Sequence, residues 1–240
     1  MSNEKRMAVL IDSDNVPYSN IGGVLNELTR YGTPTIKRIY GDWTRQSASG
    51  WKIRLLDHAI TPIQQYSYTQ GKNSTDSALI IDAMDLLYEG TADIFCIVSS
   101  DSDFTRLAVR LREAGKYVIG IGERKTPNPF IASCDKFIYL DIIEPLDSGV
   151  KPAKVRVSNE SKDILIQLLK TSVLDLADDN GYVFMGDLGN LIMKKQPDFD
   201  PRNYGFFQLT PLIKSLDLFE IEERRIPNSN VKHVYVRNRQ

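Results

Sequence analysis

Between Arg6 and Asp141, short apolar runs alternate with longer amphipathic stretches, and this alternation constrains the fold more than any other feature. The runs predict strands at 8–11, 35–40, 62–65, 93–99, 117–121 and 136–139. The stretches between them predict helices at 21–31, 50–59, 74–88, 104–114 and 129–134. Continuous apolar runs such as AVLI and IFCIV indicate strands buried on both faces, as in a parallel sheet. The pattern therefore predicts a doubly wound, Rossmann-like α/β domain with a mostly parallel sheet flanked by helices.

The pattern changes after residue 143, so we expect a first domain at 1–143 and a second at 158–240. Residues 144–157, rich in Pro, Gly and charge, predict a linker. In the second domain an apolar helical stripe comprises Ile164, Leu165, Leu168, Leu169, Leu176 and Ala177. Further helices are expected at 185–195 and 204–215, followed by two strand-like runs at 218–223 and 231–236. Three helices and a terminal hairpin predict a small winged-helix domain, in which Pro211 should bend or restart the third helix.

The charge balance excludes little. The chain has 30 Lys and Arg against 31 Asp and Glu, so there is no global attraction to nucleic acid or to a membrane. No signal-peptide pattern is present, and no apolar stretch approaches the ~20 residues needed to cross a bilayer, so we expect a soluble cytoplasmic protein. The two cysteines, Cys96 and Cys134, are too few for a disulfide framework or a cysteine zinc site.

Aspartates follow two of the predicted strands. Asp12 and Asp14 come after the first strand, and Asp101 and Asp103 after the fourth. A single such acid could cap a helix or fill a turn. In a sheet of order 3-2-1-4-5, however, strands 1 and 4 are neighbours at the switch point where ligands bind. Clustered carboxylates repel one another unless a cation neutralises them, and Mg²⁺ or Mn²⁺ prefers such oxygen ligands. These acids therefore predict a site where metal-activated water attacks a phosphoester.

Two further acids lie on the third predicted helix. Asp76 falls in its first turn, where it either joins the site or complements the helix dipole. Asp82 follows six residues later, ~600° around the helix, and points away from Asp76 by roughly 120°. Asp82 is therefore the weaker candidate for the site.

Three motifs together resemble the NYN domain of the PIN-like nuclease superfamily, over roughly residues 6–141. They are IDSDN at 11–15, GKNSTDSALIID at 71–82 and VSSDSDF at 98–104. The resemblance implies a Mg²⁺- or Mn²⁺-dependent ribonuclease. By position, the metal-binding acids would be Asp12, Asp76, Asp101 and Asp103, with Asp14 and Asp82 as possible additions. Asn15 would orient water or substrate, and Ser100 stands where many relatives have glycine.

Residues 158–238 resemble the OST-HTH or LOTUS module, a winged-helix domain. The match rests on Gly181-Tyr182-Val183, on PDFD at 197–200 and on Tyr204-Gly205-Phe206. Such modules are linked to RNA binding and to protein contacts. The resemblance therefore implies RNA as a partner, with a protein partner possible through this domain; a homo-oligomer is also left open.

Several residues could contact an RNA substrate. Lys72 and Arg106 could neutralise phosphates, and Trp43 could stack on a base. Each charge could equally be a solvated surface residue, and Trp43 could pack against a helix. In the second domain, a basic stripe for the RNA backbone could form from Lys194, Lys195, Arg202, Lys214, Arg224 and Arg225.

Two other functions remain open. The AVLIDSDNV segment also resembles the opening of haloacid-dehalogenase phosphatases, which would make Asp12 a covalent nucleophile and Asp14 an acid. The one-residue gap between Asp101 and Asp103 and the lack of a cap-domain insertion argue against that assignment. The second alternative is a non-catalytic RNA-binding or regulatory protein that retains the acids.

Overall fold

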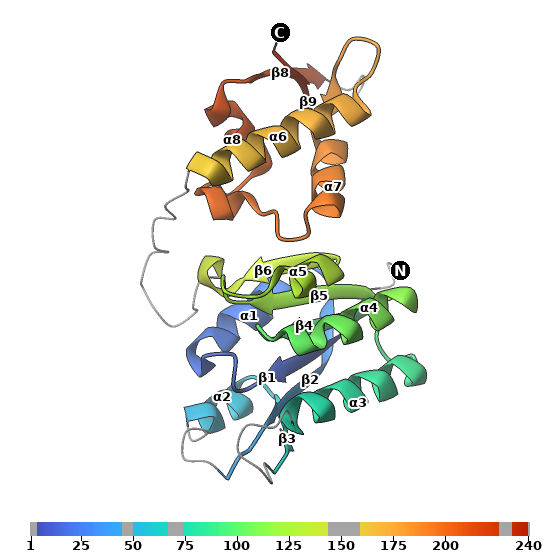
Figure 1. Ribbon diagram of the computed structural model, residues 1–240, viewed down its shortest axis with the longest axis vertical. Helices are drawn as coiled ribbons and strands as arrows, with labels where there is room; N and C mark the ends of the chain where they lie inside the picture. The colour runs from blue at the N-terminus through green and yellow to red at the C-terminus, as the bar shows by residue number, and fades with distance from the viewer. Residues whose placement is uncertain (1–3, 45–49, 67–73, 144–158, 226–231, 240) are drawn as a thin grey trace. The chain divides into compact units, whose positions relative to one another are not determined.

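The computed structural model describes residues 4–44, 50–66, 74–143, 159–225 and 232–239 (Figure 1). The chain divides into two compact units, Met1–Pro152 and Ala153–Gln240. The predicted linker at 144–157 lies outside the described residues. Within the described ranges, no helix has the length and apolar character that crossing a bilayer requires.

The first unit is built on a six-stranded sheet of order β3-β2-β1-β4-β5-β6, in which every neighbouring pair is parallel. Its strands are β1 (Arg6–Asp12), β2 (Thr33–Gly41), β3 (Thr61–Gln64), β4 (Ile94–Val98), β5 (Tyr117–Gly122) and β6 (Lys136–Tyr139). The predicted doubly wound sheet is thereby confirmed. Strands β1 and β4, which carry the acid pairs at their carboxyl ends, are direct neighbours.

Helices cover both faces of this sheet (Figure 1). They are α1 (Ile21–Leu28), α2 (Trp51–Asp57), α3 (Ser74–Glu89), α4 (Thr105–Glu113) and α5 (Asn128–Ser133), with short 3-10 turns η1 (Tyr18–Asn20), η3 (Ser102–Phe104) and η4 (Leu140–Ile142). Ala8 and Leu10 of β1 pack with α3, α4 and α5, whereas Met7, Val9 and Ile11 pack with α1 and α2. Because successive side chains of a strand point to opposite faces, a sheet covered on both sides requires the continuous apolar runs seen in the sequence.

The second unit combines three helices with a three-stranded sheet of order β7-β9-β8. Its elements are α6 (Asn159–Leu176), β7 (Val183–Phe184), α7 (Met185–Lys195), η5 (Pro201–Tyr204), α8 (Leu209–Leu216), β8 (Phe219–Arg225) and β9 (Lys232–Asn238). The terminal hairpin and the winged-helix arrangement match the prediction. Strand β7 was not predicted, because two residues are too few to show an alternating pattern.

Two details of the second unit differ from the prediction. The expected helix at 204–215 is instead η5 followed by α8, and Pro211 is the third residue of α8. The N–H groups in the first turn of a helix have no acceptor within the helix, so Pro211 removes no hydrogen bond from α8, and the helix begins before it rather than after Thr210. In the predicted apolar stripe of α6, Leu165 and Leu169 are buried as expected, but Ile164 and Leu176 are 56% and 39% exposed. Val173, which was not in the predicted stripe, lies in the core.

Candidate metal centre

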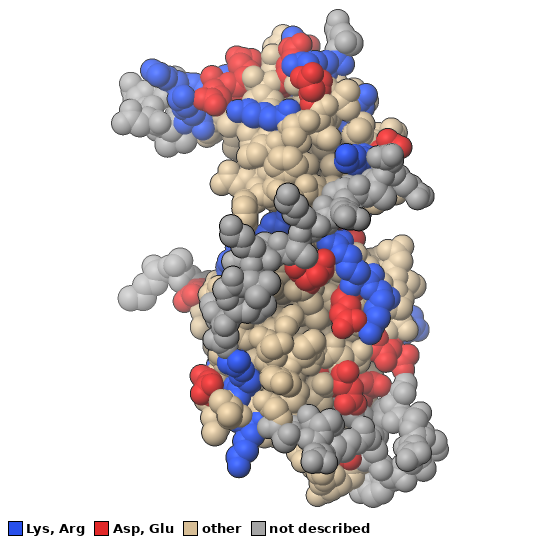
Figure 2. Space-filling view, turned by 90° about the vertical axis from the view of Figure 1, so that its left-hand side faces the viewer, with Lys and Arg blue, Asp and Glu red and all other residues tan. Residues whose placement is uncertain are grey.

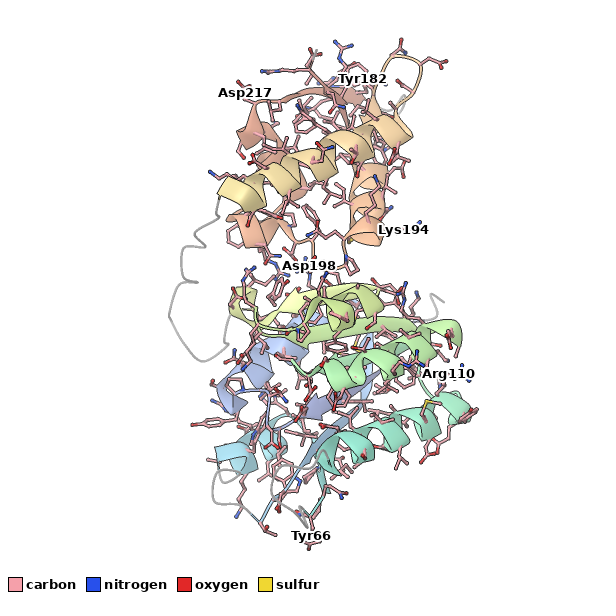
Figure 3. All side chains as sticks on the ribbon, viewed as in Figure 1. Tyr66, Arg110, Tyr182, Lys194, Asp198 and Asp217 are labelled. Atoms are coloured by element: carbon pink, nitrogen blue, oxygen red, sulfur yellow. The ribbon has the colours of Figure 1, made fainter. Side chains whose placement is uncertain are left out.

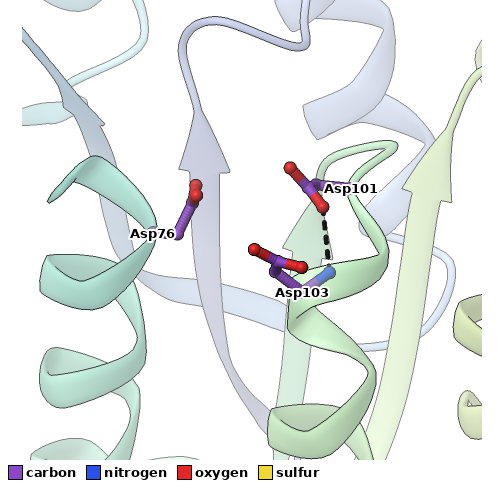
Figure 4. Close-up of side chains that lie close together, drawn as sticks. All are labelled: Asp76, Asp101 and Asp103. Carbon is purple, nitrogen blue, oxygen red and sulfur yellow. Dashed lines mark hydrogen bonds between the residues drawn. The ribbon is translucent and has the colours of Figure 1, made fainter. Parts of the chain in front are cut away.

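Asp101 and Asp103 are placed by a short turn after β4. Asp101 is the N-cap of η3, and its Oδ1 accepts the backbone N–H of Asp103 at 2.9 Å. That hydrogen bond folds the Ser-Asp-Ser-Asp segment back on itself, so the two carboxyl groups face the same side (Figure 4). Capping thus accounts for part of this motif, as Asp commonly caps helices, but it occupies only one oxygen of Asp101.

Asp76 approaches the same point from the first turn of α3. One carboxylate oxygen from each of Asp76, Asp101 and Asp103 lies within 4.8 Å of the other two (Figure 4). Asp76 and Asp101 are half-buried and Asp103 is exposed, so the group opens to solvent on one side. Three carboxylate oxygens at this spacing are a donor set suited to a hard divalent cation such as Mg²⁺ or Mn²⁺.

The electrostatics of this acidic cluster also fit a cation. Burial, followed by the negative charges of Asp12, Asp101 and Asp103, raises the pKa of Asp76 from 3.8 to about 6. Without a neutralising partner, the ionised cluster therefore destabilises itself at neutral pH. A bound divalent cation would reverse this penalty, because it supplies the opposite charge.

Asp12 lies at the end of β1 and is only 1% exposed. Its Oδ2 accepts the amide of Asn15 at 2.5 Å and the hydroxyl of Ser99 at 2.9 Å, and its Oδ1 accepts the backbone N–H of Asp14 at 3.1 Å. Burial raises the pKa of Asp12, and these hydrogen bonds work against that rise. Each carboxylate oxygen has two lone pairs, so Oδ1 keeps the capacity to bind a cation beside the cluster.

Ser99 was not predicted as a functional residue. Its hydroxyl donates to Asp12 and accepts the backbone N–H of Asp101 at 3.1 Å, so it joins the acid of β1 to the acid of the β4 loop. Ser99 is completely buried. The available signal was a serine directly after an apolar strand and two residues before Asp101, and that signal is also common in ordinary turns.

We expect Ser99→Ala to lower the free energy of unfolding by about 1–2 kcal/mol, because it removes a donor from the buried Asp12 carboxylate. Chemical denaturation measures this loss, and Mn²⁺ titration should show weaker binding. Ser133→Ala is the matched control, because Ser133 is buried and donates to the carbonyl of Phe130 at 2.7 Å. That variant should lose stability without any change in Mn²⁺ affinity; equal effects of both variants on Mn²⁺ binding would contradict the role of Ser99.

The remaining predicted acids and Asn15 occupy other positions. Asp14 is exposed and contacts Asp12 through its backbone N–H. The side-chain amide of Asn15 donates to Asp12, so it orients this carboxylate. Asp82 lies outside the acidic cluster, and its two oxygens accept hydrogen bonds from Arg38 and Tyr40 of β2.

The predicted substrate contacts are less closely grouped. Arg106 is exposed in the first turn of α4, and Lys72 lies outside the described residues. Trp43 is half-buried: its indole N–H donates to the carbonyl of Ile63 at 2.9 Å and its ring packs on the α1 and α2 side of the core. The Trp43 ring therefore makes contacts within the first unit, as the packing alternative predicted.

Comparison with known protein families confirms the predicted family of each unit. The family model of the NYN domain matches residues 6–141, which span the whole parallel sheet and all the acids described above. The chain belongs to the NYN domain family. A second family model, that of the OST-HTH/LOTUS domain, matches residues 156–231. At the level of the superfamily, the NYN domain is a nuclease-type hydrolase fold of the PIN-like group, and OST-HTH/LOTUS domains are RNA-binding modules.

Solved structures of several bacterial proteins resemble parts of this chain. A protein of unknown function from Vibrio parahaemolyticus is 19% identical and covers 58% of this chain and 94% of its own, with a TM-score of 0.49. An uncharacterized protein from Nitrosomonas europaea is 32% identical and covers 40% of this chain and 88% of its own, with a TM-score of 0.31. A protein from Chromobacterium violaceum is 28% identical and covers 37% of this chain and 88% of its own, with a TM-score of 0.27. Among curated proteins, none matches this chain.

Proposed function

We propose that this NYN protein is a metal-dependent ribonuclease that hydrolyses RNA phosphodiesters at the acidic cluster. The observation that carries the proposal is the convergence of Asp76, Asp101 and Asp103 within 4.8 Å. They meet at the carboxyl ends of β1 and β4, the switch point of a doubly wound sheet. The match to the NYN family over the same residues supports phosphodiesters as the substrate class.

In this proposal, Asp76, Asp101 and Asp103 would hold Mg²⁺ or Mn²⁺, and the nearby carboxylate of Asp12 would add negative charge that favours the ion. When bound, the ion would activate water and neutralise the charge that develops on the phosphate. Asn15 and Ser99 hold the Asp12 carboxylate in one orientation through hydrogen bonds to Oδ2. Protons compete with the ion for Asp76, whose pKa is raised in the metal-free cluster, so at limiting metal we expect activity to fall as the pH is lowered and added metal to restore it.

The environment of Asp12 disfavours the phosphatase alternative. A covalent nucleophile needs an oxygen that a phosphate substrate can reach, and Asp12 is only 1% exposed. The more accessible acids of the site are Asp101 and Asp103, which lie on the loop after β4. This position suits acids that bind a solvent-facing cation. It does not suit a mechanism in which an aspartate of β1 becomes phosphorylated.

For the second unit we propose RNA binding, with a protein partner as the alternative. Acidic and basic side chains lie interspersed on the face shown in Figure 2, in keeping with the net charge of −1. Several cations of the predicted stripe are held by carboxylates: Lys195 by Asp175, Arg202 by Asp200 and Arg224 by Glu222. Lys194, near the end of α7, is exposed (Figure 3). Lys214 of α8 is exposed as well. These two lysines, together with Arg225 of β8, which is also exposed, are the best candidates for phosphate contacts in this unit.

A mixed panel of single-stranded RNA, structured RNA and DNA tests the proposed activity. We expect RNA cleavage with Mg²⁺ or Mn²⁺ and no cleavage with EDTA, because the cluster requires a cation to neutralise its charges. Activity that persists in EDTA would exclude the metal mechanism. Absence of Mn²⁺ binding in calorimetry would instead favour the non-catalytic alternative. RNA binding measured in EDTA, where cleavage is blocked, would then show whether the second unit has an independent role.

A further inference from the structure

Tyr40, Asp82 and Arg38 form a polar contact between strand β2 and helix α3, which we call the β2–α3 bridge. One oxygen of Asp82 accepts a hydrogen bond from the Arg38 guanidinium, and the other accepts the Tyr40 hydroxyl. Tyr40 is completely buried, and the side chains of Arg38 and Asp82 are 32% and 21% exposed. Burial and then the hydrogen bond to Asp82 hold the pKa of Tyr40 well above its usual value, so the phenol remains a donor.

Tyr40 also holds the carboxyl end of β1 through its backbone. It pairs with Asp12 in the β1–β2 register. Its carbonyl accepts the backbone N–H of Ser13, the residue after Asp12, at 3.1 Å. A single residue therefore holds the end of β1 through its backbone and α3 through its side chain. These are the two elements that bring Asp12 and Asp76 to the site.

Helix α3 also packs on the sheet through apolar side chains. Leu79, Ala83 and Leu86 pack into the core on the same face as Ala8 and Leu10. Hydrophobic contacts of this kind have no preferred direction, whereas hydrogen bonds and ion pairs are directional. Asp76 lies six residues before Asp82, or about 9 Å along the helix axis. A small rotation or slide of α3 about its apolar face would therefore move Asp76 relative to Asp101 and Asp103.

We propose that the β2–α3 bridge sets the position of Asp76 in the acidic cluster, so that Tyr40, Asp82 and Arg38 are positioning residues for the metal site. This inference rests on the proposed function in one respect, because it takes the cluster to be a metal site. It also assigns Asp82, an acid of the same NYN motif as Asp76, a role outside direct metal binding. The competing explanation is that the bridge only stabilises the domain.

Two conservative variants separate these explanations. Tyr40→Phe keeps the ring in the core and removes one donor to Asp82, and Asp82→Asn keeps the side-chain shape and removes the charge. We expect each to weaken Mn²⁺ binding by about tenfold, the usual size of an effect on residues that orient ligands. Calorimetric titration of the full chain with Mn²⁺ measures the change.

Matched controls come from the opposite end of the same sheet. One carboxylate oxygen of Asp135 accepts a hydrogen bond from Arg112, and the other accepts the backbone N–H of Val118. Asp135→Asn therefore removes a comparable Arg–Asp pair, and Tyr117→Phe removes a partly exposed phenol from the start of β5. Both controls should leave the Mn²⁺ dissociation constant unchanged, even where Asp135→Asn lowers the unfolding temperature as much as Asp82→Asn does.

Crystal structures of the metal-free wild type, Tyr40→Phe and Asp82→Asn give a second measurement that does not depend on metal binding. We expect Asp76 to move beyond the 4.8 Å spacing from Asp101 and Asp103 in both variants. Unchanged spacing together with unchanged Mn²⁺ affinity would overturn the inference. A wild type that binds no Mn²⁺ would refute the proposed metal site, and the spacing alone would then decide the bridge. If Asp82→Asn does not fold, the near-isosteric Tyr40→Phe carries the test.

Discussion

Asp101→Asn is expected to reduce RNA cleavage by at least about 100-fold. Residues that only orient metal ligands cost 10–100-fold in affinity or activity, so loss of a ligand's charge should cost as much or more. The fold should survive, because asparagine is as good an N-cap as aspartate and its side-chain oxygen can still accept the Asp103 N–H. The effect would therefore report on chemistry at the cluster, and single-turnover cleavage at saturating Mn²⁺ measures it.

Asp85→Asn provides the control for this experiment, because Asp85 is an exposed aspartate on α3. It changes the net charge by the same amount and should cleave RNA at the wild-type rate. Undiminished cleavage by Asp101→Asn would exclude the acidic cluster as the site of hydrolysis. A phosphorylated Asp12 trapped in either protein would instead favour the phosphatase assignment.

Asp76→Asn is expected to be more stable than the wild type without metal and less stable than the wild type when metal is bound. The pKa of Asp76 is raised to about 6 in the folded protein. The folded state therefore binds more protons than the unfolded state between about pH 4 and 6, and stability falls as the pH rises through this window. Above pH 6 the full penalty is present. Asparagine removes it, which should stabilise the metal-free protein by about 1 kcal/mol, after allowance for solvent screening of this half-buried group.

The unfolding temperature at pH 8 in EDTA should consequently rise by about 2–4 °C in Asp76→Asn. The gain should shrink as the pH is lowered toward 4, where the wild-type carboxyl is also neutral. In Mn²⁺ the order should invert, because the wild type gains about 2.7 kcal/mol at a hundredfold excess over its dissociation constant and the variant gains much less. Asp85→Asn should show no such crossing. The same shift with Mn²⁺ in Asp76→Asn and wild type would show that Asp76 does not bind the ion.

Much of the first unit could be predicted from local patterns. The six strands and their flanking helices follow from apolar periodicity, since a strand covered on both faces must be apolar at every position. The order of the strands places Asp12 and Asp101 on neighbouring strands, and the structure confirms that order. Helix ends were less accurate: α1 ends at Leu28 rather than at Tyr31, because Thr33 already begins β2.

The polar contacts in and around the acidic cluster could not be predicted in this way. Asp76 and Asp82 are both acids of one helical motif. The sequence does not show that Asp82 accepts hydrogen bonds from Arg38 and Tyr40. The hydrogen bond from Ser99 to Asp12 could not be predicted either, because the two residues are 87 positions apart in the chain. The burial of Asp12 likewise depends on distant segments. Such contacts depend on which strands are adjacent and on how the helix is rotated over them.

The sequence by itself thus determined the sheet, its switch point and the presence of several acids at that edge. These properties follow from periodicity and chain order, which every local segment carries on its own. Only the tertiary structure decided which acids meet: Asp76, Asp101 and Asp103 lie together, Asp12 is buried at the end of β1, and Asp82 binds residues of β2. That choice is made by directional hydrogen bonds between distant segments, and such bonds exist only once the segments have packed.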